Sequence, residues 1–549
     1  MNLNLKSTAA IAITFRVLVA VSTRTFFQPD EFFQSLEVAH HAVFGYGQLT
    51  WEWTTFPPIR SIVYPSIFVP VYWILKVTGL DTGSLLVIAP KVLQGVLASG
   101  TDIGVWLLAE RVLGSRYSNI ALFLSMTSVF HFLSLSRTLS NSLETSLTTV
   151  ALCFWPLDNQ FIEKCGHPRL YMALTIAALA CMVRPTSAIL WMFLSSELFW
   201  HFRHHNNHQW SLIYAVGAIG LVSGLILTAA DSIYYGRMTF TPVNFLRTNM
   251  SAVSLFYGRS PWHFYITQAL PILTITSLPF FIIGAWTTIS TGSGPSKRLL
   301  ALVIWTILFY SFGGHKEWRF IHPILPAMHV ISSKALVDLY YRHQALAVSS
   351  RPSKARPHLP IRGTHSAFIL LGAIPAIYVL YFHGHAQISV MHYLRSLKAT
   401  QIESVGFLMP CHSTPLHAYL HQPHLSETGR VWSIGCEPPL AGEELSDYRD
   451  QSDIFYDSPA AYLREHFPKS VNFSFPPAVN ATRRSSITWN HEWPSHIVLF
   501  GALLDESILY ILHDRGYRET WAQWNGWEED WRRRGGVRVW AWRKGTDVT

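Results

Sequence analysis

Long apolar runs recur along this chain and constrain its fold more than any other feature. Each holds about 20 residues, the length that an α-helix needs to cross the hydrocarbon core of a membrane. We place about eleven such runs, the last of which ends at Phe382. They begin near residues 8, 85, 118, 140, 169, 185, 211, 262, 299, 320 and 364. Because lipid offers the backbone no hydrogen-bond partner, these runs predict an all-α polytopic membrane domain over residues 1–383.

The charge of the chain fits this prediction. Half of the 549 residues are hydrophobic and only 14% are charged, whereas soluble domains carry about 25% charge. The net charge of +9 would suit a nucleic-acid-binding protein, but the basic residues occur as small groups between the apolar runs. Such groups are typical of orientation signals for membrane helices, so we exclude the nucleic-acid class.

The same basic groups predict an orientation. The segment Pro65–Leu80 is apolar but short, and it holds two prolines and Lys76. If the N-terminus is cytosolic and this segment does not cross, the later basic groups fall on the cytosolic side. These groups are Arg111/Arg116, Lys164/Arg169, Arg203, Lys297/Arg298 and the run from Arg342 to Arg362. We therefore expect residues 65–80 to be re-entrant or interfacial, and the first helix to be retained and not cleaved as a signal peptide.

From residue 384 onward the chain becomes polar and contains no further spanning run. Short apolar segments such as His496–Phe500 and Val537–Trp542 predict strands, so residues 384–549 are expected to form a mixed α/β lumenal domain. Cys411 and Cys436 lie in this region and can pair in an oxidising lumen.

Three N-glycosylation sequons fall on the lumenal side in the same orientation, at Asn249, Asn472 and Asn480. Because sequons and basic groups are independent signals, their agreement favours a cytosolic N-terminus and a lumenal C-terminus.

An acidic constellation follows the first run, in the predicted lumenal loop 28–84. Asp30 and Glu31 are adjacent, and Gln34 and Glu37 share a helical face with Asp30 by their spacing. The loop continues with Thr50-Trp51-Glu52-Trp53 and Arg60-Ser61. A carboxylate here can accept the proton of a sugar hydroxyl as the hydroxyl attacks. The alternative is that Asp30 and Glu31 cap a short helix, since acids favour the first turn.

Two further polar segments fall on the same predicted side. The first runs from Ser136 through Arg137 to Asn141, and it is either functional or an ordinary capped hairpin. The second is Gly313-Gly314-His315-Lys316-Glu317-Trp318-Arg319-Phe320. Lysine as a point charge and arginine as a fork both suit a lipid phosphate. The alternative is a charged turn in which Glu317 neutralises a neighbour.

These segments together resemble glycosyltransferase family 22, the mannosyltransferases that use dolichyl phosphate mannose. The likeness rests on Gln28-Pro29-Asp30-Glu31-Phe32-Phe33-Gln34-Ser35-Leu36-Glu37, on Thr50-Trp51-Glu52-Trp53 and on His315-Lys316-Glu317-Trp318-Arg319-Phe320. Arg137-Thr138-Leu139-Ser140-Asn141 and Arg184-Pro185-Thr186 also match. Within the family, the combination is most similar to the enzymes that add the third mannose of the glycosylphosphatidylinositol (GPI) anchor.

The resemblance implies a GT-C fold in the endoplasmic reticulum membrane, with a lumenal active site. It also implies inverting α1,2-mannosyl transfer from dolichyl phosphate mannose to the dimannosyl GPI precursor glycolipid. We assign the base role to Asp30, with Glu31 as the alternative base or as a hydrogen-bond partner of the acceptor. The donor phosphate is assigned to His315, Lys316, Arg319 and Arg137, and the acceptor to Gln34, Glu37, Glu52 and Arg60. The sequence has no CxxC or Cys/His metal spacing. The pair Asp30 and Glu31 could hold a metal, but none is expected, because the departing phosphate has basic partners.

Other functions stay open at this point. Another family member would add the fourth GPI mannose or would act on the dolichol-linked N-glycan precursor. A lipid or sugar transporter would also be polytopic, but transporters often contain internal repeats around a central site, and we find no such repeat. A non-catalytic scaffold subunit has no need of acidic and basic clusters on one side of the membrane.

Overall fold

The computed structural model describes residues 4–158, 168–204, 206–347, 359–440, 448–481 and 489–543. The chain packs as two compact units. The first unit consists of residues 1–22, 56–67 and 91–377, and the second of residues 23–55, 68–90 and 378–549. Lys164, Cys165 and part of the basic run that follows Arg342 lie outside the described residues.

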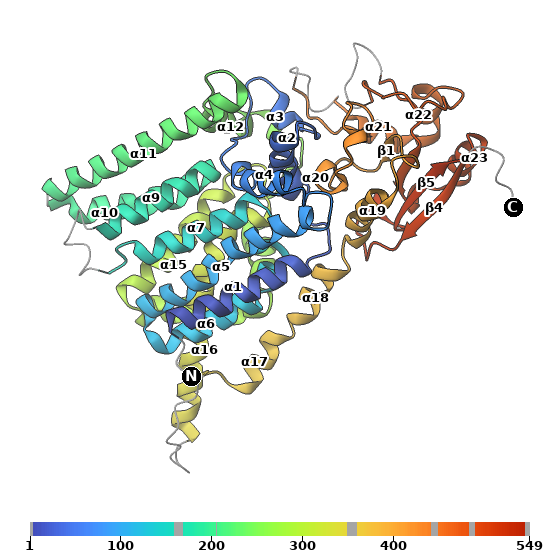
Figure 1. Cartoon of the computed structure of the whole chain (residues 1–549). Helices are drawn as coiled ribbons and strands as arrows, with labels where there is room; N and C mark the ends of the chain where they lie inside the picture. The colour runs from blue at the N-terminus through green and yellow to red at the C-terminus, as the bar shows by residue number, and fades with distance from the viewer. Residues whose placement is uncertain are drawn as a thin grey trace. The chain divides into compact units, whose positions relative to one another are not determined.

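The first unit is helical (Figure 1). Its main helices are α1 (Leu5–Ser22), most of α5 (Leu85–Leu113), α6 (Ser115–Thr127), α7 (Ser140–Phe154), α9 (Pro168–Val183), α10 (Ala188–His201), α11 (Asn206–Tyr235), α12 (Thr241–Met250), α13 (Leu270–Thr274), α14 (Leu278–Thr291), α15 (Gly294–Ser311), α16 (Leu325–Ala347) and α17 (Gly363–Leu370). Short turns join them, among which are η3 (His131–Leu135), η4 (Pro185–Ser187), η7 (Tyr265–Ala269) and η9 (Trp318–Ile324). A break between α9 and η4 falls at Arg184-Pro185, where Arg184 is extended, as a residue before proline prefers.

Six helical segments of the described chain are long and apolar enough to cross a membrane. They cover Leu5–Ser22, Leu85–Leu113, His208–Tyr235, Tyr265–Thr291, Trp318–Leu346 and Gly363–Ser396. The chain is therefore a helical multi-pass membrane protein.

Close helix contacts and a buried ion pair hold this unit together. Gly95 of α5 approaches α1 so closely that a Cβ there would lie 2.7 Å from the Cα of Val17. Small residues permit such approaches between membrane helices. About two turns further along α5, Asp102 accepts hydrogen bonds from Nε and Nη2 of Arg16 at 2.6 and 2.9 Å. Neither side chain is exposed, so the pair links α1 to α5 inside the bundle.

The second unit contains a five-stranded mixed sheet with the order β2-β1-β3-β5-β4. The strands are β1 (Val405–Leu408), β2 (Val431–Ser433), β3 (His496–Phe500), β4 (Tyr517–Gln523) and β5 (Val537–Trp542). β1 lies parallel to both β2 and β3, whereas β5 is antiparallel to β3 and β4. The three parallel strands are buried along their whole length, as strands covered on both faces are. β3 and β5 have the bounds that their apolar segments predicted.

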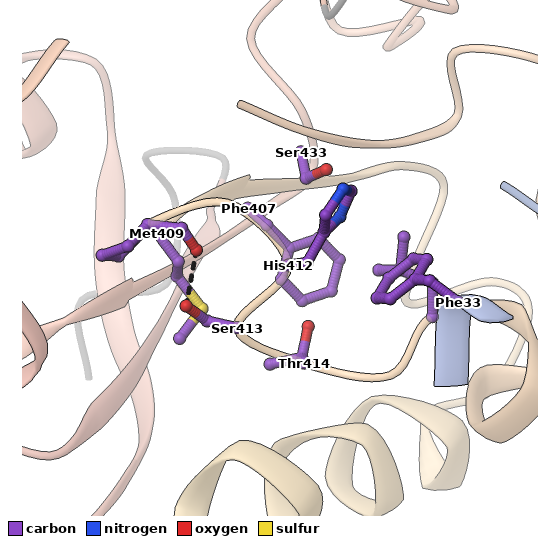
Figure 2. Close-up of a pocket in the computed structure, with 9 residues that line it drawn as sticks. Phe33, Phe407, Met409, His412, Ser413, Thr414 and Ser433 are labelled. Carbon is purple, nitrogen blue, oxygen red and sulfur yellow. Dashed lines mark hydrogen bonds between the residues drawn. The ribbon is translucent and has the colours of Figure 1, made fainter. Parts of the chain in front are cut away.

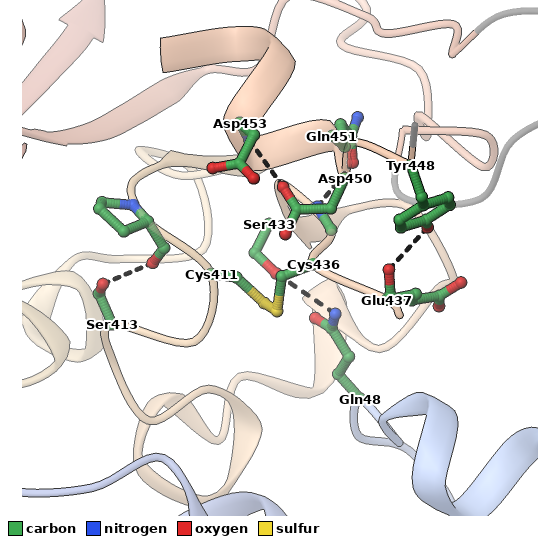
Figure 3. The surroundings of a disulfide bond; sticks show 12 residues. Gln48, Cys411, Ser413, Ser433, Cys436, Glu437, Tyr448, Asp450, Gln451 and Asp453 are labelled. Carbon is green, nitrogen blue, oxygen red and sulfur yellow. Dashed lines mark hydrogen bonds between the residues drawn. A yellow bond between two sulfur atoms is a disulfide. The ribbon is translucent and has the colours of Figure 1, made fainter. Parts of the chain in front are cut away.

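Short helices accompany the sheet: α19 (His385–Ser396), α20 (His417–Leu420), α21 (Gln451–Asp457), α22 (Pro459–His466) and α23 (Glu506–Asp514). Residues of α21, α22 and α23 share one hydrophobic core with Trp432 of β2 and Ile497 of β3. A disulfide between Cys411 and Cys436 ties the loop after β1 to the loop after β2 (Figure 3).

Two N-terminal segments, 23–55 and 68–90, belong to this second unit. They carry η1 (Phe32–Leu36), α2 (Glu37–Phe44), α3 (Trp51–Thr54) and α4 (Val69–Thr78). With 10 residues, α4 rises about 15 Å, half the thickness of the hydrocarbon core. It exposes Trp73, Ile74 and Val77, an apolar face suited to a membrane interface.

Candidate active site

The acidic segment, residues 30–37, lies in the second unit and contains the π-helical turn η1. The carbonyl of Pro29 accepts hydrogen bonds from the amides of Phe32 and Phe33, and η1 begins directly after Glu31. Glu31 is buried, with 6% of its surface exposed, and Asp30 is half-buried. A π-turn widens the helix locally and is frequent at functional sites.

Gln34 and Glu52, both predicted to bind the acceptor, contact each other. Gln34 Nε2 donates to Glu52 Oε2 at 3.1 Å. The indole of Trp53 donates to the carbonyl of Phe33 at 3.0 Å, which fixes α3 against η1. The Thr-Trp-Glu-Trp motif therefore brings a further carboxylate beside the acidic segment.

Glu37 is fully buried and its carboxylate holds two distant segments. Oε1 accepts from the backbone N–H groups of Gln48 and His417, both at 3.0 Å, and Oε2 accepts from Ala418 at 2.8 Å. Burial raises the pKa of Glu37 to about 7, against the opposite effect of these three amides. Gly47 leaves room for the contact, since a Cβ there would lie 3.4 Å from Oε1. These contacts are structural, and the role of Glu37 toward the acceptor stays a prediction.

His412 lies next to the acidic segment, a placement that the sequence did not indicate. Its ring packs on Phe33 of η1 with centroids 4.3 Å apart, as Figure 2 shows. Burial lowers its pKa to about 4, and the charge of Asp30 acts in the opposite direction. His412 follows Cys411 directly and has a left-handed backbone with φ 52°, a conformation rare for histidine. The two cysteines of the polar region, Cys411 and Cys436, were the sequence signal that could have pointed to this loop.

The predicted basic segment lies in the first unit; it follows α15 and continues into η9, which contains Arg319. Glu317 accepts two hydrogen bonds from Arg319, at 2.6 and 2.9 Å, and contacts His315 at 3.3 Å. Burial alone would raise the pKa of Glu317, but the Arg319 and His315 charges hold it well below its usual range. In return, the hydrogen bond to Glu317 raises the pKa of His315. Lys316 is buried and donates to the backbone carbonyls of Ser260 and Gly313.

The other polar segment joins this one. Asn141 Nδ2 donates to the carbonyl of Arg319 at 3.2 Å, so the two stretches that are far apart in sequence are adjacent. Arg137, with 2% of its surface exposed, donates to the carbonyl of Leu133 at 2.7 Å.

Arg184 completes a cluster of arginines in the first unit. It forms an ion pair with Glu144 at 3.1 Å, and the charges of Arg319 and Arg60 both act on it. Arg60, predicted as an acceptor ligand, therefore lies among the basic residues. Three guanidinium groups with two carboxylates nearby leave a positive site, which suits an anion such as a phosphate.

The two sets of predicted residues thus fall in different units. Asp30, Glu31, Gln34, Glu37 and Glu52 belong to the second unit, and Arg60, Arg137, His315, Lys316 and Arg319 to the first. The three sequon asparagines, Asn249, Asn472 and Asn480, are all exposed.

Metal-binding geometry occurs once in the described part of the chain, at Cys411, His412 and Cys436. A metal ion would need both thiolates, whereas the two sulfurs here are bonded to each other. The residues present therefore suit a disulfide and not a metal.

Comparison with known proteins places these residues in context. A model of the Alg9-like mannosyltransferase family matches residues 7–421. GPI mannosyltransferase 3 of Yarrowia lipolytica is 36% identical, over 97% of this chain and 97% of that protein. GPI mannosyltransferase 3 of Aspergillus fumigatus is 33% identical, over 97% of this chain and 78% of that protein. GPI alpha-1,2-mannosyltransferase 3 of Danio rerio is 34% identical, over 91% of this chain and 83% of that protein.

One solved structure shares the fold over nearly the whole chain. ArnT from Cupriavidus metallidurans, in a crystal structure with undecaprenyl phosphate, superposes with a TM-score of 0.56. The match covers 97% of both chains at 11% identity, so it concerns the fold alone.

Proposed function

The chain belongs to the Alg9-like mannosyltransferase family, and on that basis we propose that it adds the third mannose of the GPI anchor. The donor in this proposal is dolichyl phosphate mannose, and the acceptor is the dimannosyl GPI precursor. The new linkage is α1,2. The observation that carries the proposal is the likeness to GPI mannosyltransferase 3, 36% identical over 97% of both chains.

The chemistry needs one base and one anion site. The acceptor hydroxyl gives its proton to the Asp30 carboxylate while its oxygen bonds to the anomeric carbon of the donor. The bond from that carbon to the phosphate oxygen breaks, and its electron pair leaves with the dolichyl phosphate. A single displacement of this kind inverts the anomeric configuration and requires no covalent intermediate. Glu31 is the alternative base, and the charge of Asp30 acts on His412 beside it.

The departing phosphate gains negative charge, which fixed cations stabilise. We assign this role to Lys316, Arg319, His315 and Arg137, and we add Arg184 and Arg60 because their charges act together with that of Arg319. Gln34, Glu37 and Glu52 remain the proposed acceptor residues of the acidic loop. A divalent metal is not required in this scheme.

We place the protein in the endoplasmic reticulum membrane, with about eleven spanning helices of GT-C type and the active site in the lumen. Besides the six long apolar helices, α6, α7, α9, α10 and α15 occupy the remaining predicted spans. The short helix α4, with its exposed apolar face, fits the interfacial segment. Asn249, Asn472 and Asn480 would then be open to lumenal glycosylation, and loss of the glycans from Asn→Gln variants would be seen as faster electrophoretic mobility.

The proposal is tested with purified protein, radiolabelled dolichyl phosphate mannose and the dimannosyl GPI precursor. The wild-type product should be cleaved by an α1,2-specific mannosidase. Asp30→Asn should lower kcat by about 10²–10⁴-fold, the usual effect of removing a general base. The matched control is Asp457→Asn, whose exposed carboxylate pairs with Arg449 in the second unit. Near-normal activity of Asp30→Asn would overturn the base assignment.

Two further experiments test the choice of acceptor and the absence of a metal requirement. Depletion of the protein from cells should cause a two-mannose GPI precursor to accumulate, whereas a truncated dolichol-linked oligosaccharide would point to the N-glycan pathway. Transfer should also continue in the presence of a chelator, and its complete loss would restore a role for a metal.

A further inference from the structure

A cavity of about 550 Å³ lies within the second unit, and its lining includes Gln48 and His417, whose backbone amides donate to Glu37. Its volume falls within the range of about 300–1,000 Å³ that small-molecule sites occupy. One wall comes from the turn Gly45–Trp51, and the others come from the loops around β2 and from Ala478–Asn480. His412 and His417 also line it.

The position of the cavity in the sheet is that of a binding site. After β1 the chain crosses to β2 on one side, and after β2 it crosses to β3 on the other side of β1. Ligands of open parallel sheets bind at such a reversal, beyond the carboxyl ends of the strands. The two loops that leave β1 and β2 there are joined by Cys411–Cys436, and both contribute to the cavity wall. The disulfide thus holds the wall in one conformation (Figure 3).

Four buried polar atoms of the cavity wall find no hydrogen-bond partner among the described residues. They are Gln48 Oε1, Thr50 Oγ1, His412 Nδ1 and His417 Nδ1. Thr50 and His417 have only 8% and 6% of their surface exposed. Buried polar groups are nearly always satisfied, so four among the residues of one cavity indicate a ligand rich in hydroxyl groups.

The charges of the wall select the ligand further. No lysine or arginine is among the described residues that line the cavity, whereas Glu427 and Glu437 are. A phosphate group would therefore be poorly held. Tyr46, Trp51 and Trp432 add aromatic surface, on which the apolar face of a sugar ring can pack.

We propose that this cavity binds the sugar headgroup of the acceptor, with Gln48 and Thr50 as ligands of its hydroxyl groups. The inference rests on the proposed function and goes beyond it, because it places acceptor recognition at the junction of the N-terminal loop and the C-terminal domain. His412, which lines the cavity and packs on Phe33 of η1, connects the bound sugar to the segment that carries Asp30.

The double variant Gln48→Met/Thr50→Val removes both side-chain groups and keeps their size. We expect it to raise the KM for the acceptor about 10–100-fold, as the loss of two hydrogen bonds would. The kcat and the KM for dolichyl phosphate mannose should stay within twofold, because the lost contacts serve binding alone. Thr520→Val, on β4 and away from the cavity, is the matched control and should leave all three values unchanged. All proteins carry Asn480→Gln, so that no glycan attached at the cavity rim can fill it.

An unchanged acceptor KM in a double variant with wild-type thermal stability would overturn the inference. If the double variant does not fold, photolabelling of the wild-type chain decides instead. A diazirine-bearing dimannoside should label peptides from Gly45–Trp51 or Thr428–Glu437, and labelling confined to the first unit would contradict the proposal. Failure of the wild-type enzyme to use any lipid-linked mannoside would instead overturn the proposed function, while the photolabel still reports on the cavity.

Discussion

His417 shows how burial of one residue sets a pH limit on the fold. Its side chain is 6% exposed, and its backbone amide is held by Glu37. Burial lowers the pKa of its imidazole to about 4, so the ring is neutral near pH 7. A neutral ring keeps one nitrogen as a hydrogen-bond acceptor, to which a hydroxyl group in the cavity that His417 lines can donate.

Acid should therefore destabilise the protein through His417. Below about pH 6.5 the unfolded chain binds a proton there, whereas the folded chain binds none until about pH 4. The free energy of unfolding should fall across this window by about 3 kcal/mol, and it should be unaffected by this group above pH 6.5. Thermal unfolding of the wild type and of His417→Gln at pH 7 and pH 4.5 measures the effect. The variant should lose less stability on acidification; equal losses would contradict the prediction. His513→Gln, at an exposed position, is the control.

At the scale of helices, the buried pair Arg16–Asp102 links α1 to α5. Asp102→Leu should destabilise the protein by about 3–5 kcal/mol, because it leaves the Arg16 charge buried without its partner. The double variant Arg16→Met/Asp102→Leu should recover most of this loss, since it removes both charges. Unfolding of the three proteins in one detergent measures the difference, and a double variant no more stable than Asp102→Leu would contradict the explanation.

The disulfide makes a second prediction at this scale. Cys411 and Cys436 are 25 residues apart, and closing a loop of this length stabilises a fold by about 3.5 kcal/mol in the chain-entropy estimate. Cys411→Ser/Cys436→Ser should lower the unfolding free energy by about that amount. Cys153→Ser/Cys181→Ser replaces two free cysteines of the first unit and is the control. Non-reducing peptide mapping should recover residues 411 and 436 in one linked peptide pair, and free thiols at both would contradict the bond.

The elements also differ in how well the sequence predicts them. A membrane helix is predicted by its own apolar run, and β3 and β5 are predicted by their short apolar segments. The π-turn at Phe32–Leu36 has no such signal, because it differs from an α-helix only in its hydrogen bonds. Helical spacing describes only neighbours on one helix. It therefore could not predict that Gln34 contacts Glu52, or that Glu37 binds the backbone amides of His417 and Ala418.

For the whole molecule, the main surprise is that the loop after the first helix and the C-terminal region pack as one unit. The sequence indicated Asp30 and Glu31 as a polar pair, but it did not show that His412 lies beside them, because the two segments are far apart in the chain. Glu37 binds backbone amides, which do not depend on the type of residue, so the sequence gives no sign of these contacts. Polar side chains that stand together in the sequence are therefore easier to point out than the contacts that hold their segments in place.

Glu37→Ala should loosen the packing of the loop after the first helix against the C-terminal region. It leaves three buried N–H groups without an acceptor, each of which costs about 1–3 kcal/mol. We expect faster proteolysis at Gly45–Thr50 and around His417, while the first unit keeps its melting behaviour. Glu52→Ala, in the same loop but bonded to a side chain, is the control. Equal protease resistance of Glu37→Ala and the wild type would contradict the coupling.

The contacts of Glu37 with distant residues also determine when its loop can finish folding. Its carboxylate and the amide of His417 are 380 residues apart, so the ribosome needs about 20–80 s to make the partner after it has made the acid. Throughout that interval the loop that carries Glu37 has been synthesised, but the residues around His417, against which it packs, have not. Completion of the acidic loop must therefore be a late event in biogenesis, after the last spanning helix has emerged. A chain that stalls or ends before residue 417 would leave a membrane bundle whose acidic loop lacks the C-terminal partners of Glu37.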